Sequence, residues 1–273
     1  MSAPQDRRDG RPPILSGKRF DEASVFTPEA LLREARRQKD MADGDLPEIC
    51  ILDPDGDLVA HLTATGSAGR HASWACYHTH LYAFERGGVR YGVVGSAVGA
   101  SFAVLVAEQL FASGCRLLIS MTSAGQILPV RAPPYFILID RALRDEGTSY
   151  HYLPPADFSA CDPALVEVAC DALAGTSLPL EVGATWTTDA PFRETATAVD
   201  KARETGLLAV EMEAAALYAF AAARRRLVLC VAHVTNQMGQ IEGDFEKGAA
   251  NGALASLGVI ESIACSWLGR CPP

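Results

Sequence analysis

Two glutamates, Glu211 and Glu213, stand on either side of Met212, directly before an alanine-rich apolar stretch that begins at Ala214. Burying a carboxylate costs several kcal/mol unless hydrogen bonds compensate for the lost hydration. Two acids at the head of an apolar helix therefore need polar partners, and a ligand with several hydroxyl groups, such as a sugar, could supply them. On the other interpretation, both acids only complement the positive end of the helix dipole.

Three polar segments follow apolar runs that we interpret as strands, and they are candidates for the same site. They cover residues 120–126, 187–195 and 235–239. Ligands in open α/β sheets bind where the strands end. In the first segment, backbone N–H groups and the hydroxyls of Thr122 and Ser123 could hold an anion or a sugar hydroxyl. An ordinary loop is the alternative.

Alternating strands and helices would position these segments. Thr27 is a suitable N-cap and Pro28 fits the first helical position, so we expect a helix to begin there. Further helices are predicted from residue 58 and over residues 101–113, 163–174, 200–205, 214–223 and 249–268. Strands are predicted over residues 49–52, 116–120, 135–140, 180–186 and 227–236, with a hairpin over 74–99. This order is typical of an α/β sheet with helices on both faces. We expect a flexible arm over residues 1–20 and a single domain over residues 21–273.

The composition excludes some classes of protein. The chain has 273 residues, a formal net charge of −9 and a pI of about 5.2. This acidic balance argues against a general nucleic-acid binder, because phosphate backbones need a basic face. No apolar run reaches the roughly 18 residues of a membrane span. The first residues carry no apolar signal core. We therefore expect a cytoplasmic protein that does not contact a membrane.

No metal site is predicted. The eight cysteines include no pair with CxxC spacing, so neither a zinc site nor a redox motif is indicated. His78 and His80 would share one face of a predicted strand. Without a third ligand, they are better explained as surface or subunit-contact residues. The acids of the segment 53–57 lack the ligand spacing of a calcium loop and predict a plain turn.

The order of these motifs resembles that of a known family. The most specific element is Val210-Glu211-Met212-Glu213-Ala214-Ala215, and segments 95–99, 122–125, 146–151 and 187–189 precede it. From about Ile49 to Leu268 the chain resembles the nucleoside phosphorylase family, on the side of uridine phosphorylase and hexameric purine nucleoside phosphorylase. The resemblance implies a three-layer α/β/α sandwich with a mixed, barrel-like central sheet, assembled as a dimer or hexamer. It also implies cleavage of the N-glycosidic bond of a nucleoside without a cofactor, with phosphate as the possible co-substrate.

The resemblance assigns a role to each candidate residue. Met212 would pack on the ribose, Glu213 would hold its 2′- and 3′-hydroxyls, and Glu211 would lie behind them. The nucleophile or phosphate loop would contain Ser120, Thr122, Ser123 and Gly125, and the base would contact Phe192, Arg193 and Ala124. Asn236 and Asp189 are the candidates for catalysis at the leaving base. The Asn236 amide could donate a hydrogen bond, and Asp189 or a water would supply a proton.

The chain departs from this family at the phosphate site. The family usually places an arginine in an early Gly-Asp-Pro-x-Arg turn, but here the turn reads Asp53-Pro54-Asp55-Gly56-Asp57. The position before the Thr-Ser loop is Ser120-Met121, again without arginine. Neutral hydroxyls do not replace the bidentate, charge-assisted bonds of arginine. Arg70, Arg90, His78 and His80 are candidates to rebuild an anion site.

Three functions are therefore open from the sequence. The first is phosphorolysis of a purine or pyrimidine ribonucleoside to a free base and a sugar phosphate. The second is hydrolysis, because the Thr122–Gly125 loop also resembles the nucleosidase branch, which lacks that arginine. The third is nucleoside binding without turnover. Retention of Glu213 argues against the third, and the missing arginines argue against the first.

Overall fold

The structure of the chain is a computed structural model that describes residues 12–239 and 242–269. Most of the predicted arm, residues 1–11, lies outside the described residues. Residues 12–20 contain a short 3-10 helix, η1 (Pro13–Leu15), and the chain then continues to the first α-helix, α1 (Pro28–Lys39). Thr27 caps this helix by accepting a hydrogen bond from the Ala30 N–H at 3.2 Å, which confirms the predicted start.

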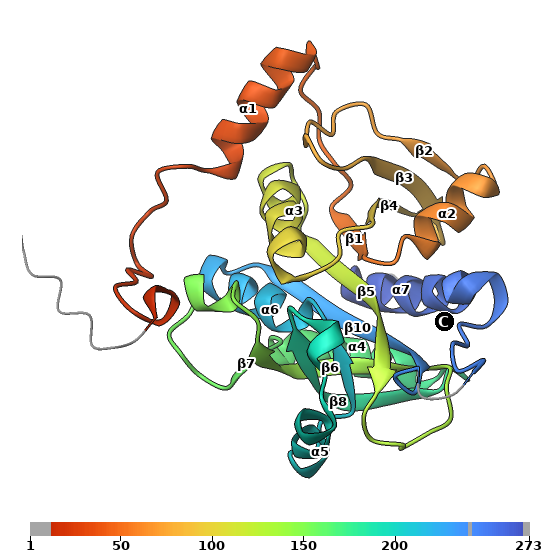
Figure 1. Cartoon of the computed structure of the whole chain (residues 1–273). Helices are drawn as coiled ribbons and strands as arrows, with labels where there is room; N and C mark the ends of the chain where they lie inside the picture. Colours follow the sequence, from red (N-terminus) through yellow and green to blue (C-terminus); the bar gives the residue numbers. More distant parts are fainter. Residues whose placement is uncertain (1–11, 240–241, 270–273) are drawn as a thin grey trace, which may run out of the picture.

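The strands form one ten-stranded mixed sheet, part of which closes on itself. The strand order is β10-β6-β8-β9-β5-β1-β4-β3-β2, with β7 paired to β6 outside this path, and β10 also pairs with β5. The strands are β1 (Ile49–Asp53), β2 (Ala68–Arg70), β3 (Leu81–Arg86), β4 (Val89–Gly95), β5 (Leu117–Gln126), β6 (Tyr135–Asp145), β7 (Phe158–Ala160), β8 (Leu180–Thr188), β9 (Ala209–Glu211) and β10 (Leu227–Asn236). Strands β5, β9, β8, β6 and β10 therefore make a closed barrel, and β1 to β4 continue the sheet from β5 (Figure 1).

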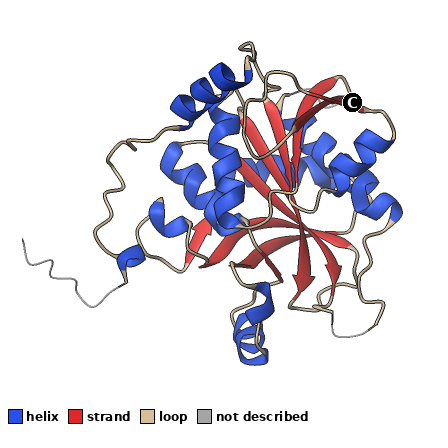
Figure 2. Cartoon of the chain, turned by 45° about the horizontal axis from the view of Figure 1, so that its top comes forward, coloured by secondary structure: helices blue, strands red, loops and turns tan. Residues whose placement is uncertain are grey.

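Helices cover both sides of this sheet (Figure 2). The remaining helices are α2 (Asp57–Ala64), α3 (Ala100–Ala112), α4 (Pro163–Ala174), α5 (Ala196–Glu204), α6 (Ala214–Arg224) and α7 (Ala253–Trp267). Helices α3 and α6 pack on each other, and α4 packs on α7. The result is the predicted three-layer α/β/α arrangement around a barrel-like mixed sheet.

Helix α6 is fixed to the barrel by a fully buried tyrosine. The Tyr218 hydroxyl donates to the Ile139 carbonyl of β6 at 2.5 Å and accepts from the Cys230 N–H of β10 at 3.0 Å. One side chain thus satisfies two buried backbone groups that would otherwise lack partners. Since Glu213 precedes α6, this contact also helps to set the position of the two site glutamates.

Several predicted boundaries were wrong: β6 continues to Asp145 rather than residue 140, and α5 begins at Ala196 rather than residue 200. Strand β5 does not break at Met121 but continues to Gln126, because β10 pairs along it and β9 pairs with Gly125 and Gln126. His78 and His80 precede β3, which begins at Leu81, so they do not share a strand face. The last α-helix begins at Ala253 rather than Ala249, because the backbone from Ala250 to Gly252 takes left-handed φ angles.

Residues 249–267 are long and apolar enough to cross a membrane by length and composition alone. This finding corrects the expectation that no stretch of the chain reaches that length. The segment is η4 (Ala249–Gly252) followed by α7, and half of it is buried inside the protein, where α7 packs on α4 and α2. Core helices of this kind pass the same test of length and composition.

Removing the Tyr218 hydroxyl should destabilise the barrel. The change Tyr218→Phe leaves the Ile139 carbonyl and the Cys230 N–H buried without their partner, at a cost of about 2 kcal/mol in the free energy of unfolding. Equilibrium urea denaturation measures this cost. The control is Tyr82→Phe on β3, whose half-buried hydroxyl has no hydrogen bond among the described residues and whose change should cost less than about 0.5 kcal/mol. Equal effects of both changes would contradict the assigned role.

Candidate active site

The two glutamates that drew attention in the sequence lie where β9 ends and α6 begins, and both are buried. Glu211 is 3% exposed and Glu213 is 1% exposed. Glu211 is the last residue of β9, and Glu213 occupies the N-cap position of α6. Two carboxylates at this depth persist only if hydrogen bonds replace their hydration, so their partners define the site.

Glu211 is held by four donors. Its Oε2 accepts from the N–H groups of Glu213 and Ala214, each at 2.7 Å. Its Oε1 accepts from the hydroxyls of Thr185, at 3.2 Å, and Thr187. Burial raises the pKa of this carboxyl, and these hydrogen bonds oppose the shift. All four donors are internal, so Glu211 fixes the start of α6 against β8.

Glu213 joins three elements of the site. Its Oε1 accepts from the Gly99 N–H at 2.7 Å and its Oε2 accepts from the Thr122 hydroxyl of β5 at 2.8 Å. Gly99 caps α3 with a φ of 89°, a conformation that favours glycine. A carboxylate has about four acceptor positions, so each oxygen retains capacity for a hydroxyl donor. Burial and the neighbouring Glu211 raise the pKa of Glu213 to about 7.

A second polar cluster lies beside Ser123, on the turn between β1 and α2. The Ser123 hydroxyl donates to Asp55 at 2.9 Å. Lys247 Nζ donates to Asp55 at 2.6 Å and to Asp57 at 2.5 Å. The carboxyl of Asp53, on the same turn, is buried, and this burial raises its pKa to about 7. The predicted turn is present, but Asp55 and Asp57 pair with a lysine about 190 residues away in the chain, and Asp53 accepts from the Val59 N–H at 3.0 Å.

The candidate residues at the end of β10 are held by local contacts. Asn236 pairs with Gly125 across β10 and β5. The Asn236 side chain accepts from the Met238 N–H at 2.8 Å and donates to the Thr235 hydroxyl at 3.2 Å. A Cβ added at Gly125 would lie within 3.4 Å of the side chains of Met238, Asn236 and Val210. Gly125 therefore provides close packing between β5, β9 and β10 at this end of the barrel.

The polar loop after β8 lies at the surface. Asp189 is exposed and accepts from the Gly147 N–H at 2.8 Å, so it connects this loop with the segment that follows β6. Phe192 is 99% exposed and Arg193 is also exposed. No part of the described protein packs on the Phe192 ring, which is unusual for an aromatic side chain of this size.

The structure brings some of the predicted site residues into direct contact and leaves others apart. Thr122, Glu213 and Glu211 form one hydrogen-bonded chain with the start of α6. Met212 is half-buried beside them, Ala124 is buried, and Ser120 is fully buried within β5, where solvent does not reach its hydroxyl. Among the described residues, no hydrogen bond connects Asp189 or Asn236 to Thr122, Glu213 or Glu211.

Several contributors could not be found by reading the sequence. Gly99 was noted only as part of a turn, and its N–H is a direct partner of Glu213. Thr185 lies within a predicted strand and Thr187 in the polar segment 187–195, and nothing in the sequence shows that both donate to Glu211. Lys247 gave no signal, because its partners are far away in the chain. No group of His, Cys, Asp and Glu side chains among residues 12–239 and 242–269 could hold a metal ion.

Comparison with known proteins gives a consistent result. The sequence pattern of the phosphorylase superfamily matches residues 48–263. The purine nucleoside phosphorylase DeoD-type of Bacillus cytotoxicus is 33% identical over 137 residues, which are 50% of this chain and 58% of the relative. The same values hold for the protein of that name from Bacillus thuringiensis. The match thus spans little more than half the length of these relatives.

Solved structures confirm the fold. The crystal structure of uridine phosphorylase from Vibrio fischeri ES114 complexed with 6-hydroxy-1-naphthoic acid superposes with a TM-score of 0.71 at 18% identity, over 84% of this chain and 98% of the other. A second crystal structure of that enzyme gives a TM-score of 0.68 at 19% identity, over 81% and 92% of the two chains. Together with the match over residues 48–263, these likenesses identify the chain as a member of the phosphorylase superfamily.

Proposed function

We propose that the chain cleaves the N-glycosidic bond of a purine or pyrimidine ribonucleoside and releases the free base, as a pentosyltransferase or a hydrolase. The observation that carries this proposal is the buried Glu213 carboxylate, which lies between the start of α3, strand β5 and the start of α6. Membership of the phosphorylase superfamily supports the same reaction class.

The chemistry suits a fixed carboxylate. Breaking a glycosidic bond passes through an oxocarbenium-like state in which positive charge develops on the sugar. Glu213 would accept hydrogen bonds from the 2′- and 3′-hydroxyls and face that charge, while Met212 would pack on the ribose. Because its position is set before the substrate arrives, the carboxylate does not have to reorganise during the reaction. Glu211 acts only through the backbone that it holds.

We assign the departing base to the loop after β8 and the end of β10. Phe192 would stack on the base and become covered when ligand is bound, which accounts for its exposure in the free chain. Asn236 would donate a hydrogen bond to the base after its side-chain amide leaves the Thr235 hydroxyl. Asp189, with its carboxylate at the surface, or a water would supply a proton, and Arg193 and Ala124 would line the same side.

The nucleophile is either phosphate or water. Phosphate is supported by the family. Water is supported by the cluster beside Ser123, where Lys247 is already paired with Asp55 and Asp57. Because both carboxylates already bind the Lys247 ammonium, it is not free to bind an anion. The carboxylates of Asp53, Asp55 and Asp57, which line the same pocket, would also repel phosphate. This observation makes hydrolysis the second candidate function.

A nucleoside panel tests the proposed function directly. Incubation with uridine, adenosine, inosine and guanosine, with and without phosphate, should release free base, which is followed by chromatography. Phosphate-dependent release supports phosphorolysis and phosphate-independent release supports hydrolysis. Binding of a nucleoside without release of base would contradict turnover and leave only a binding function.

The proposed ribose contact can be tested in the same assay. The change Glu213→Ala removes the carboxylate from the sugar and should lower kcat/KM by about 100-fold or more. A matched control is Glu194→Ala, which removes a half-buried carboxylate of the loop after β8 that has no assigned role. Full activity of the Glu213 variant would show that the ribose assignment is wrong.

The raised pKa of Glu213 predicts the pH dependence of the reaction. Only the ionised carboxylate can face the developing charge, so kcat/KM should rise with an apparent pKa near 7. Asp53 also has a pKa raised to about 7. The change Asp53→Asn should therefore leave the rise in place, whereas Glu213→Gln should abolish it. If the rise in kcat/KM near pH 7 disappeared in Asp53→Asn, it would belong to the ionisation of Asp53 and not of Glu213.

Stability should depend on pH with the opposite sign. In the folded protein Glu213 holds its proton up to a pH of about 7, against an ordinary value of 4.5. Between these values the native state binds more protons than the unfolded state, so the contribution of Glu213 to stability falls as pH rises. Thermal unfolding of the wild type and of Glu213→Gln, followed from below pH 4.5 to above pH 7, should show the variant gaining stability relative to the wild type over this window.

We further propose that the chain assembles as a homo-oligomer, a dimer or hexamer, and acts on nucleosides in the cytoplasm, as expected for nucleoside salvage. Light scattering of the purified chain determines the assembly. A monomer at micromolar concentration would contradict this part of the proposal and leave the reaction itself untouched.

A further inference from the structure

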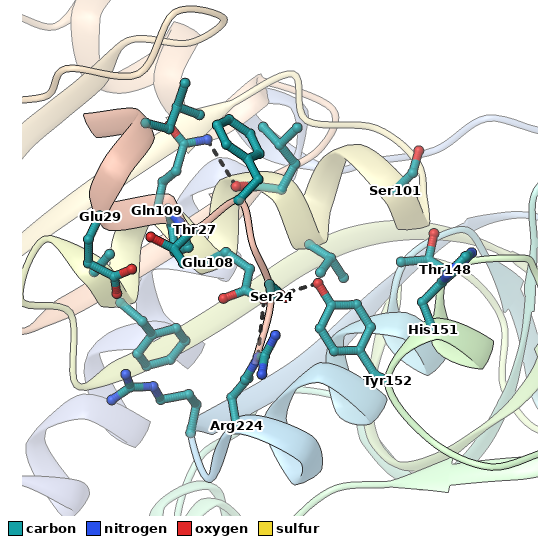
Figure 3. A pocket seen from close by; sticks show the side chains of 18 of the residues that line it. Ser24, Thr27, Glu29, Ser101, Glu108, Gln109, Thr148, His151, Tyr152 and Arg224 are labelled. Atoms are coloured by element: carbon teal, nitrogen blue, oxygen red, sulfur yellow. Dashed lines mark hydrogen bonds and ion pairs between the residues drawn. The ribbon is translucent and has the colours of Figure 1, made fainter. Parts of the chain in front are cut away.

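A cavity of about 690 Å³ lies away from the candidate active site, between the segment before α1, helix α3, the loop after β6 and the end of α6 (Figure 3). Cavities of about 300–1,000 Å³ are typical of small-molecule sites. Its lining includes none of Glu211, Glu213, Thr122 or Ser123. The proposed reaction therefore leaves this cavity unexplained.

One part of the wall is apolar. Phe111, Val104 and Leu105 of α3 line it, together with Phe26 and Leu31 from the segment before α1 and from α1 itself. Leu105 is 39% exposed and Phe26 is 71% exposed. Two large apolar side chains with this much open surface, both lining one cavity, can cover a flat apolar group bound there.

The other part of the wall carries guanidinium groups that have few partners. Arg226 lies over the Phe111 ring, with its guanidinium carbon 5.4 Å from the ring centre, and has no acceptor for its side chain within the described residues. Arg224 uses its Nε for Glu108 at 3.4 Å, and its two terminal nitrogens have no hydrogen-bond partner there. A guanidinium presents a planar fork of donors that fits a carboxylate or phosphate.

Of the acids that line the cavity, Glu108 pairs with Arg224, and neither Glu108 nor Glu29 pairs with Arg226 among the described residues. Glu108 accepts from the Tyr152 hydroxyl at 3.0 Å and from Arg224 Nε (Figure 3), so its charge is already in use. Glu29 is exposed on the first turn of α1, where water screens it. His151 pairs with Lys18 at 2.9 Å. Arg226 remains the charged group that gains most from an added anion.

We propose that this cavity is a second ligand site, for a small organic anion with a flat apolar body. The acid group binds to Arg226 and to the terminal nitrogens of Arg224. The apolar body lies between Phe111, Leu105 and Phe26. Hydroxyls of Ser101 and Thr148 line the far part of the cavity and can bond to polar groups of the ligand. Nucleoside monophosphates and simple aromatic acids share this chemistry.

The test uses the full chain and the fluorescent probe 1-anilinonaphthalene-8-sulfonate, an anion with a flat apolar body. We expect saturable binding that Arg226→Gln weakens about tenfold or more, as expected for loss of a charge-assisted contact. Leu105→Trp, which places a bulky ring where the apolar body of the probe would lie, should weaken binding about tenfold or more. The matched control is Arg225→Gln, since Arg225 is the neighbouring arginine and does not line the cavity; it should leave binding unchanged.

Competition identifies the natural class of anion. If UMP and AMP displace the probe and 1-naphthoate does not, the site binds nucleotides. If 1-naphthoate displaces the probe and the two nucleotides do not, the site binds aromatic acids. Uridine and adenosine, which lack the acid group, should not displace it, and Glu213→Ala should still bind the probe. Binding is measured without turnover, so failure of the proposed reaction leaves this test intact.

Several results would overturn the proposal. Equal weakening by Arg225→Gln and Arg226→Gln would show unspecific attraction to a basic helix end. Displacement by uridine, together with loss of binding in Glu213→Ala, would place the probe in the active site instead. Unchanged probe binding in Leu105→Trp, with a smaller assembly in light scattering, would show that a second copy of the chain occupies this surface.

Discussion

The Glu211 carboxylate accepts hydrogen bonds from two backbone N–H groups at the start of α6 and from two threonine hydroxyls of β8. Removing any of these donors would leave the buried carboxylate with one hydrogen bond fewer. The four contacts therefore fix β8, β9 and the start of α6 relative to one another. Glu213 follows two residues later, and its orientation is a consequence of that geometry. The two acids thus differ in role because of their partners. The four donors of Glu211 belong to β8 and to the start of α6, whereas Glu213 bridges Gly99 at the start of α3 and Thr122 of β5.

The sequence predicted most of the scaffold and singled out Thr122, Glu211 and Glu213, which the structure joins by hydrogen bonds. Strong local signals did this: Thr27 and Pro28 at a helix start, the apolar run of β10, and the acids around Met212. It failed where distant pairing overrides local pattern. The segment from Thr122 to Gly125 reads as a loop of small residues, but β10 on one side and β9 on the other extend it as strand. Small side chains there permit the close approach of strands that closes the barrel.

The contacts of the cluster beside Ser123 could not be predicted for the same reason. Asp55 and Asp57 read as a solvated turn, and Lys247 as part of a polar link, since no local pattern joins residues so far apart in the chain. Folding places one ammonium between two carboxylates. Such a group is a weak phosphate site, because an incoming anion must compete with carboxylates that are already bound to the lysine. The family fold therefore does not by itself determine which nucleophile this chain uses.

Helices α3 and α6 connect the two regions that carry unexplained chemistry. The first turns of both helices lie at Glu213. Its carboxylate accepts from the N–H of Gly99, the N-cap residue of α3, and Glu213 is itself the N-cap residue of α6. Each also reaches the cavity, where Glu108 of α3 pairs with Arg224 of α6. The position of one helix against the other is therefore set at two places, at Glu213 and at the pair of Glu108 and Arg224. In the proposed second site an acid would bind the terminal nitrogens of Arg224 and leave its Nε with Glu108.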